Sequence, residues 1–196
     1  GAIRTNNWTL NGSGAGYLNT PTLQFLQIDN LTGNNGTDNF FITNNGALSG
    51  VINGGTGTDT LTGDALPNAW SITALNQGRL GGLNTANLQA YGFTGIENLV
   101  GNTGTDAFVI SGGRLDGYIN GVGSSGNTLT GDNIATTWTI NGSNSVSMLS
   151  NDGINPAFNP VTGNVSNIQS LVGGGSNDTF VLAGGTLAGT VAGGGS

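Results

Sequence analysis

The sequence predicts an all-β protein. The expected fold class is a right-handed parallel β-helix (β-solenoid), with about 21–23 residues per coil and a long repeat of about 68 residues. Three observations lead to this prediction. One long stretch of sequence recurs three times, a short glycine-rich turn recurs within it, and the apolar residues gather in short clusters typical of strands.

The long repeat consists of nearly matching stretches, each with a Leu, a glycine-rich turn, an Asp and a strand. These stretches are residues 31–42, 99–110 and 171–182. Each is followed by Gly-x-Leu-x-Gly, and a strand containing Trp8, Trp70 or Trp138 closes each unit. We therefore expect a single solenoid segment over residues 1–196, excised from a longer repeat array. Its partial repeats are 1–63, 64–131 and 132–196.

A shorter spacing lies inside the long repeat. The turn Gly-x-x-Gly-Thr-Asp at residues 33–38 returns at 54–59, about 21 residues later. We interpret this spacing as one coil, with three coils to each long repeat and Asp38 close to Asp59. Gly, Asn and Asp suit the corners, because corners need positive φ and close backbone approach. Stacked coils share one narrow core, since no coil can bury its apolar face alone.

Strand alternation predicts which side chains enter that core. The expected inward set is Phe40, Ile42, Phe108, Ile110, Phe180 and Leu182, and the three Trp are expected to pack in the core or at a coil edge. The intervening residues Phe41, Val109 and Val181 are also apolar. Alternation does not explain them, so their positions stay open.

Composition excludes several classes of function. The formal net charge is −7 with only three Lys or Arg, which argues against binding nucleic acid or an anionic membrane surface. No apolar run approaches the roughly 20 residues of a membrane helix, so we expect no membrane insertion of this segment. Without His, Cys or Lys, no Ser–His or Cys–His nucleophile can be built, and we predict that the chain is not an enzyme.

Carboxylates leave one catalytic alternative open, a polysaccharide-active β-helix enzyme. Asp59 with Asp64, and Asp116 with Arg114, are the close combinations. We interpret Arg114 and Asp116 as an exposed ion pair. The aspartates recur at corresponding turn positions, whereas an active site should be singular.

Residues 54–62 match the nonapeptide of calcium-binding β-rolls. Because Ca²⁺ prefers oxygen ligands, Asp38 and Asp59 are the candidate metal ligands, and a calcium-stabilised repeat module is a further alternative. The competing interpretation is that each Asp caps its turn by accepting hydrogen bonds from backbone amides. The chain has one complete nonapeptide, so we expect no cofactor to be required for folding.

The distance from each Trp to the next core Leu varies, and insertions in solenoids map to loops. Residues 11–24, 74–92 and 142–164 are therefore predicted to protrude. Loops on rigid scaffolds commonly carry function. The candidate contact residues are Arg79, Tyr91, Asp152 and Phe158.

The sequences at 96–108 and 113–121 resemble the β-strand repeats of giant exoproteins of Gram-negative bacteria, the filamentous-haemagglutinin-like and biofilm-matrix adhesins. The resemblance covers essentially the whole chain. It implies a secreted protein at the bacterial cell surface, whose repeats form a stalk that mediates surface or matrix attachment. The implied partners are neighbouring repeats of the same chain at both ends, together with matrix polysaccharide or other cell-surface molecules.

Overall fold

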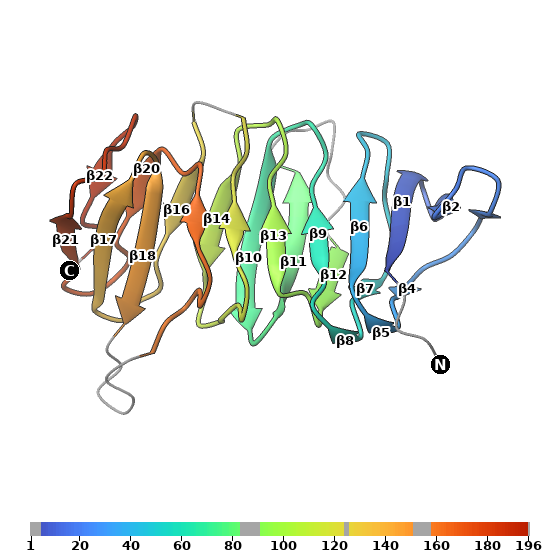
Figure 1. The fold of residues 1–196 in the computed structure, drawn as a ribbon, viewed down its shortest axis with the longest axis horizontal. Helices are drawn as coiled ribbons and strands as arrows, with labels where there is room; N and C mark the ends of the chain where they lie inside the picture. The colour runs from blue at the N-terminus through green and yellow to red at the C-terminus, as the bar shows by residue number, and fades with distance from the viewer. Residues whose placement is uncertain (1–4, 83–90, 124–125, 151–157, 196) are drawn as a thin grey trace.

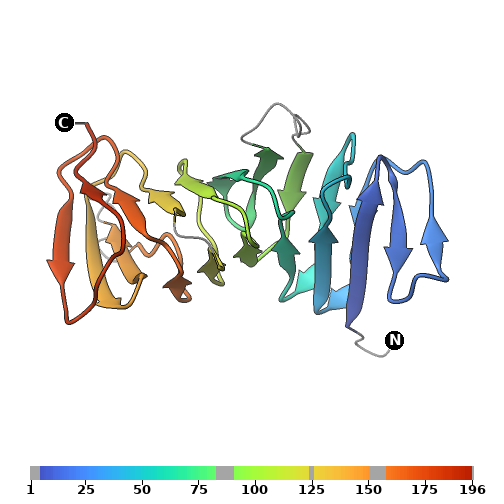
Figure 2. The same ribbon diagram turned by 90° about the horizontal axis from the view of Figure 1, so that it is seen from above.

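The computed structural model describes residues 5–82, 91–123, 126–150 and 158–195 of this chain. These residues form twenty-two strands and no helix, so the protein is all-β as predicted. The strands lie across an elongated body with the two chain ends at opposite ends (Figure 1). The body is also elongated when it is seen from above (Figure 2).

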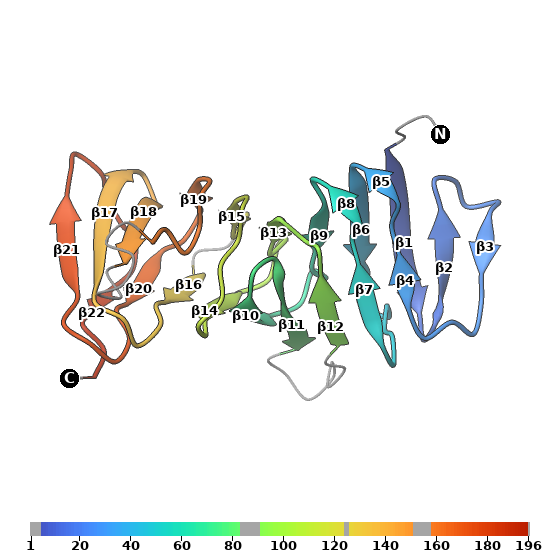
Figure 3. The ribbon, with the colours of Figure 1, turned by 90° about the horizontal axis from the view of Figure 1, so that it is seen from below.

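Two large sheets form the two layers of the body, which Figure 3 shows from below. The eleven-stranded sheet contains β1 (Asn6–Gly12), β2 (Ala15–Leu18), β3 (Gln24–Phe25), β6 (Asp38–Ile42), β9 (Thr60–Thr62), β13 (Asn98–Val100), β15 (Ile119–Asn120), β17 (Thr136–Gly142), β18 (Ser145–Ser150), β19 (Val165–Ser166) and β21 (Thr179–Leu182). The nine-stranded sheet contains β4 (Leu31–Thr32), β7 (Val51–Asn53), β10 (Asn68–Ala74), β11 (Gln77–Gly82), β12 (Tyr91–Thr94), β14 (Ala107–Ile110), β16 (Thr128–Thr130), β20 (Ser170–Val172) and β22 (Val191–Ala192). The glycine-rich turns add a two-stranded sheet of β5 (Asn35–Gly36) and β8 (Thr56–Gly57).

Most strand pairs are parallel, and the chain alternates between the two large sheets. Partners in a parallel pair are one coil apart in sequence. Asp38 and Asp59 are separated by 21 residues, and so are Asp106 and Asn127. Where a hairpin intervenes, the separation rises to 38 residues, as between Asn68 and Asp106. The predicted coil of about 21–23 residues is therefore correct only for the coils without a hairpin.

Three antiparallel units of three strands each, called hairpins below, interrupt the parallel order. The sequence analysis did not predict them. They are β1–β2–β3, β10–β11–β12 and β17–β18–β19, each of which starts with the Trp strand of its repeat. The hairpin strands occupy much of the regions predicted to protrude. The described parts of these regions therefore widen the sheets, while residues 83–90 and 151–157 lie outside the described residues.

Within one long repeat the chain adds strands to the two large sheets five times, alternating between them. The hairpin comes first, then β4, β6, β7 and β9, and the next hairpin begins at β10. It therefore makes two and a half coils, and the predicted three is wrong. Because five is odd, equivalent elements of successive repeats lie in opposite sheets. Thus β6, β14 and β21 belong to the eleven-, nine- and eleven-stranded sheets in turn.

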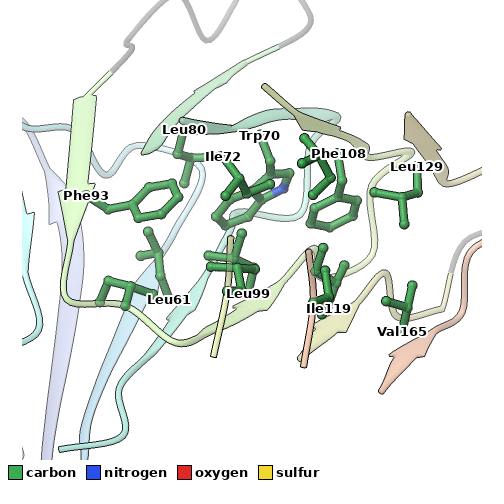
Figure 4. Packing of buried hydrophobic residues seen from close by; sticks show 14 of the residues in the cluster. Leu61, Trp70, Ile72, Leu80, Phe93, Leu99, Phe108, Ile119, Leu129 and Val165 are labelled. Carbon is green, nitrogen blue, oxygen red and sulfur yellow. The ribbon is translucent and has the colours of Figure 1, made fainter. Parts of the chain in front are cut away.

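A continuous hydrophobic core separates the two sheets. In Figure 4, Leu61, Leu99, Ile119 and Val165 face side chains of the other sheet, among them Trp70 and Phe108. The predicted inward residues Phe40, Ile42, Phe108 and Ile110 are buried. Phe180 is only partly buried, although it packs against the core as expected.

Leu182 was predicted to be buried, and this prediction is wrong, because its side chain is 73% exposed on the edge strand β21. Phe41, Val109 and Val181 are exposed by 40%, 37% and 41%. Strand alternation therefore holds in β6 and β14, where Phe41 and Val109 point outward, whereas in the edge strand β21 both Val181 and Leu182 are exposed.

Each Trp stacks on the Phe of the neighbouring parallel strand. The ring centroids are 6.0 Å apart for Trp8 and Phe40, 5.6 Å for Trp70 and Phe108, and 5.7 Å for Trp138 and Phe180. Trp70 and Trp138 are fully buried, as predicted for core packing, whereas Trp8 is partly buried. These stacks join the hairpin of each repeat to the parallel strand beside it.

Candidate functional site

The two Gly-x-x-Gly-Thr-Asp turns lie on top of each other, as the repeat predicted. β5 and β8 pair in parallel, with Asn35 opposite Thr56. The Asp38 amide donates to Asp59 Oδ1 at 2.7 Å, and Asp38 Oδ2 accepts the Asn34 amide of its own turn at 2.8 Å. The expected proximity of Asp38 and Asp59 is therefore confirmed.

The same contact repeats along the body and forms a ladder. At each step, a side-chain oxygen accepts a hydrogen bond from the backbone amide of the corresponding residue one coil earlier. In the eleven-stranded sheet it continues from the Asp59 amide to Glu97 Oε2 at 2.7 Å. The nine-stranded sheet has its own ladder, in which Asp106 Oδ1, Asn127 Oδ1 and Gln169 Oε1 accept the amides of Asn68, Asp106 and Asn127. Thr136 donates to Asp178 Oδ1 in the third repeat. The turn aspartates thus serve as hydrogen-bond acceptors that fix coil register.

Each ladder aspartate lies against a glycine that opens its turn. A Cβ added to Gly54 would come within 1.9 Å of the Gly95 carbonyl oxygen and 2.6 Å of Asp59 Oδ2. Gly101 faces Asp106 Oδ2 in the same way. The glycines are therefore needed because the carboxylate and the next coil occupy the space that a side chain would take.

Burial changes the acidity of these carboxyls. Desolvation raises the pKa of Asp59 to about 6, opposed by the hydrogen bond from the Asp38 amide and assisted by the charges of Glu97 and Asp38. Desolvation likewise raises the pKa of Asp106 to about 6, against two hydrogen bonds from Asn68. Asp59 Oδ2 and Asp106 Oδ2 have no hydrogen-bond partner among the described residues.

The calcium hypothesis can be compared with this geometry. Both carboxylate oxygens of Asp38 accept hydrogen bonds, Oδ1 from the Asn6 side chain and Oδ2 from the Asn34 amide. Asp59 Oδ1 is also occupied. A cation at Asp38 and Asp59 would compete with these amides. In the described ranges, no group of three or more His, Cys, Asp or Glu could hold a metal ion. The role of Asp38 and Asp59 as calcium ligands stays a prediction.

Chelation provides the test. We expect the far-ultraviolet circular dichroism and the thermal midpoint to be the same with and without EDTA, because the register bonds of Asp38 and Asp59 need no ion. Calcium added after EDTA serves as the control. A loss of β signal in EDTA that calcium restores would contradict this expectation and support the calcium-stabilised alternative.

Three of the four predicted contact residues lie in the described ranges, and these three do not form one surface. Arg79 is exposed on β11, where it lies opposite Ser71 and Gly92. Tyr91 is only 4% exposed and belongs to the hydrophobic core, so the expectation that it is a surface group is wrong. Phe158 is half-buried, and its carbonyl accepts the Ser150 amide. Asp152 lies outside the described residues.

Arg114 and Asp116 form the expected exposed ion pair, with 2.8 Å between Arg114 Nη2 and Asp116 Oδ1. Asp59 and Asp64 are both buried. None of the described residues belongs to a helix long and apolar enough to cross a membrane.

One feature was missed from the sequence, a cleft beside the buried Asp132. The signal was present in an alignment of the repeats, because Asn44 and Asn102 each correspond to a glycine one repeat later, Gly112 and Gly174. Comparison with protein-family models, curated proteins and solved structures found no match to this chain.

Proposed function

We propose that this chain is a segment of a right-handed β-solenoid that serves as the stalk of a secreted bacterial adhesin or biofilm-matrix protein. Its role is structural: it holds attachment regions away from the cell surface, and it carries out no catalysis. The segment acts outside the cell, in contact with neighbouring repeats of its own chain.

The observation that carries this proposal is the uninterrupted core between the two sheets, which contains side chains from all three repeats. Such a core and the amide ladders transmit order from coil to coil, as in repeat proteins whose units contact only their neighbours. The outer surface supports the same role. With only 7% charged residues in the chain, its faces offer hydroxyl, amide and small apolar groups suited to weak contacts with neutral matrix.

A replacement experiment in cells that display the full-length protein tests the stalk role. Deleting residues 5–195 should reduce attachment, whereas replacing them with an unrelated solenoid of equal length should restore it, because a stalk contributes distance. Surface display is measured with an antibody to a distal tag as the control. If the variant with the replacement solenoid is displayed normally and attachment stays lost, the segment contributes more than distance, and the stalk proposal fails.

A further inference from the structure

A cleft of about 430 Å³ lies at the carboxyl ends of three adjacent parallel strands, β14, β16 and β20. Its volume falls within the range of small-molecule pockets, about 300–1,000 Å³. The lining includes Val109, Gly112, Asp132, Asn133, Ile134 and Gly174. The cleft belongs to the inner coils, with further strands on both sides of it in the nine-stranded sheet.

The equivalent position in the preceding repeat, at the ends of β6, β9 and β13, contains two asparagine side chains. Asn44 Oδ1 accepts the Ala65 amide at 3.1 Å, and Asn102 Nδ2 donates to the Gly63 carbonyl at 3.2 Å. In the cleft, the turn after β14 is one residue shorter and contains Gly112, and Gly174 replaces Asn102. Both hydrogen bonds are thus lost, which leaves the Asn133 amide and the Gly131 carbonyl without these asparagine partners.

Asp132 adds a buried acceptor to the same cleft. It is 7% exposed, and its Oδ1 accepts the Ile134 amide at 3.2 Å, which fixes the carboxyl group. Its Oδ2 has no hydrogen-bond partner among the described residues. A buried acceptor without a partner is costly, so a ligand that donates a hydrogen to this oxygen recovers that free energy.

The chemistry of the walls selects the ligand. The residues that line the cleft bring the Asp132 carboxyl and the Gly131 carbonyl as acceptors, the Asn133 amide as a donor, and the apolar side chains of Val109 and Ile134. A metal ion requires oxygen ligands on most sides, and the apolar walls do not supply them. A pyranose ring carries hydroxyl donors and acceptors around its edge and C–H groups on its face, which matches this mixture.

We propose that the cleft at Asp132 binds a neutral hexose unit, with a sugar hydroxyl donating to Asp132 Oδ2. The ring edge takes the polar positions that asparagines occupy in the preceding repeat, and its C–H face lies on Val109 and Ile134. This site is independent of the stalk role, because a stalk that binds no sugar is still a stalk.

The test is an NMR titration of the segment with the methyl glycosides of glucose, galactose and mannose, one at a time. At least one glycoside is expected to give saturable shifts of the amides at 109–112, 131–134 and 174, with a dissociation constant in the millimolar range. Asp132→Asn should weaken that binding by about tenfold or more, because it removes a charge-assisted hydrogen bond. Asparagine can still accept the Ile134 amide, so the turn is retained.

Asp64→Asn is the matched control, since Asp64 Oδ1 accepts the Leu66 amide just as Asp132 Oδ1 accepts that of Ile134. Asp64→Asn changes the place equivalent to the cleft one repeat earlier, where Asn44 and Asn102 fill the space. It should therefore leave glycoside binding unchanged. Gly112→Asn should block the cleft: its Cβ meets no atom within 4 Å, and asparagine tolerates φ of +76°. The proposal is overturned if no glycoside gives saturable shifts, if Asp64→Asn and Asp132→Asn weaken binding equally, or if calcium chloride alone produces the same shifts.

Discussion

Replacing Trp70 with alanine is expected to lower the free energy of unfolding by about 3–5 kcal/mol. Trp70 is 1% exposed and stacks on Phe108, so its removal leaves a cavity between the two sheets. The loss is not confined to one strand, because β10 joins the hairpin to the parallel strand β14. Since each coil is stabilised by its neighbours, the cavity weakens the coupling between the first and third repeats as well.

Trp8→Ala supplies the matched comparison, since Trp8 occupies the same repeat position and stacks on Phe40 but is only partly buried. We expect it to cost less than Trp70→Ala in urea denaturation followed by circular dichroism and tryptophan fluorescence. Equal costs for the two variants would show that burial in the inner core does not set the stability of this fold.

Replacing Asp59 with asparagine is expected to stabilise the protein at pH 7 by about 1–3 kcal/mol. Asparagine already stands at the corresponding ladder position of the next repeat, where Asn127 Oδ1 accepts the Asp106 amide and Nδ2 donates to the Asn167 carbonyl at 3.0 Å. In the earlier repeat, Asp59 Oδ2 and the Gly95 carbonyl both lie against Gly54. An asparagine there keeps the register bond from Asp38 and removes a buried charge.

The same carboxyls predict how stability depends on pH. The folded pKa of Asp59 and of Asp106 is raised from 3.8 to about 6, so between these values the folded state binds more protons than the unfolded state. Their contribution is therefore fully present below about pH 4, falls as the pH rises toward 6, and is constant above that. Burial and the nearby Asp178 charge raise the pKa of Asp132 in the same direction.

Urea denaturation at pH 4, 5, 6 and 7 measures this dependence. The wild-type protein should be more stable at pH 5 than at pH 7, and Asp59→Asn should reduce the difference. Asp116→Asn is the control, because it breaks an exposed ion pair worth less than about 1 kcal/mol. Wild-type stability that rises from pH 5 to pH 7 would contradict the argument.

The sequence was sufficient to predict the elements that recur without variation. The alignment of the turns at 33–38 and 54–59 placed Asp38 beside Asp59, and strand alternation identified Phe40 and Phe108 as core residues. The hairpins escaped prediction because β11 contains Gln77, Gly78 and Arg79, which have little strand preference. Their turns lie at 13–14 and 143–144, where Gly14 and Asn144 take positive φ, and Gly and Asn are the residues that such turns favour.

The candidate site was less predictable, because it depends on packing between coils. Tyr91 looks like a surface group in a polar insertion, yet strand pairing brings it opposite Leu80 and into the core. Asp132 is one of several similar aspartates in sequence. What distinguishes it is the absence of side chains at positions 112 and 174, which are distant in sequence and adjacent only after folding.

The odd number of sheet visits in each long repeat constrains how such a protein can change its length. Each hairpin adds strands to one sheet, and successive hairpins add them to opposite sheets, so the two sheets have similar numbers of strands, eleven and nine. Inserting or deleting a single repeat would turn everything that follows by half a revolution about the long axis. A binding group downstream would then face away from its former target. Gains or losses of repeats in pairs preserve that orientation, and we expect lineages of this protein to differ by even numbers of repeats wherever a downstream region must face one way.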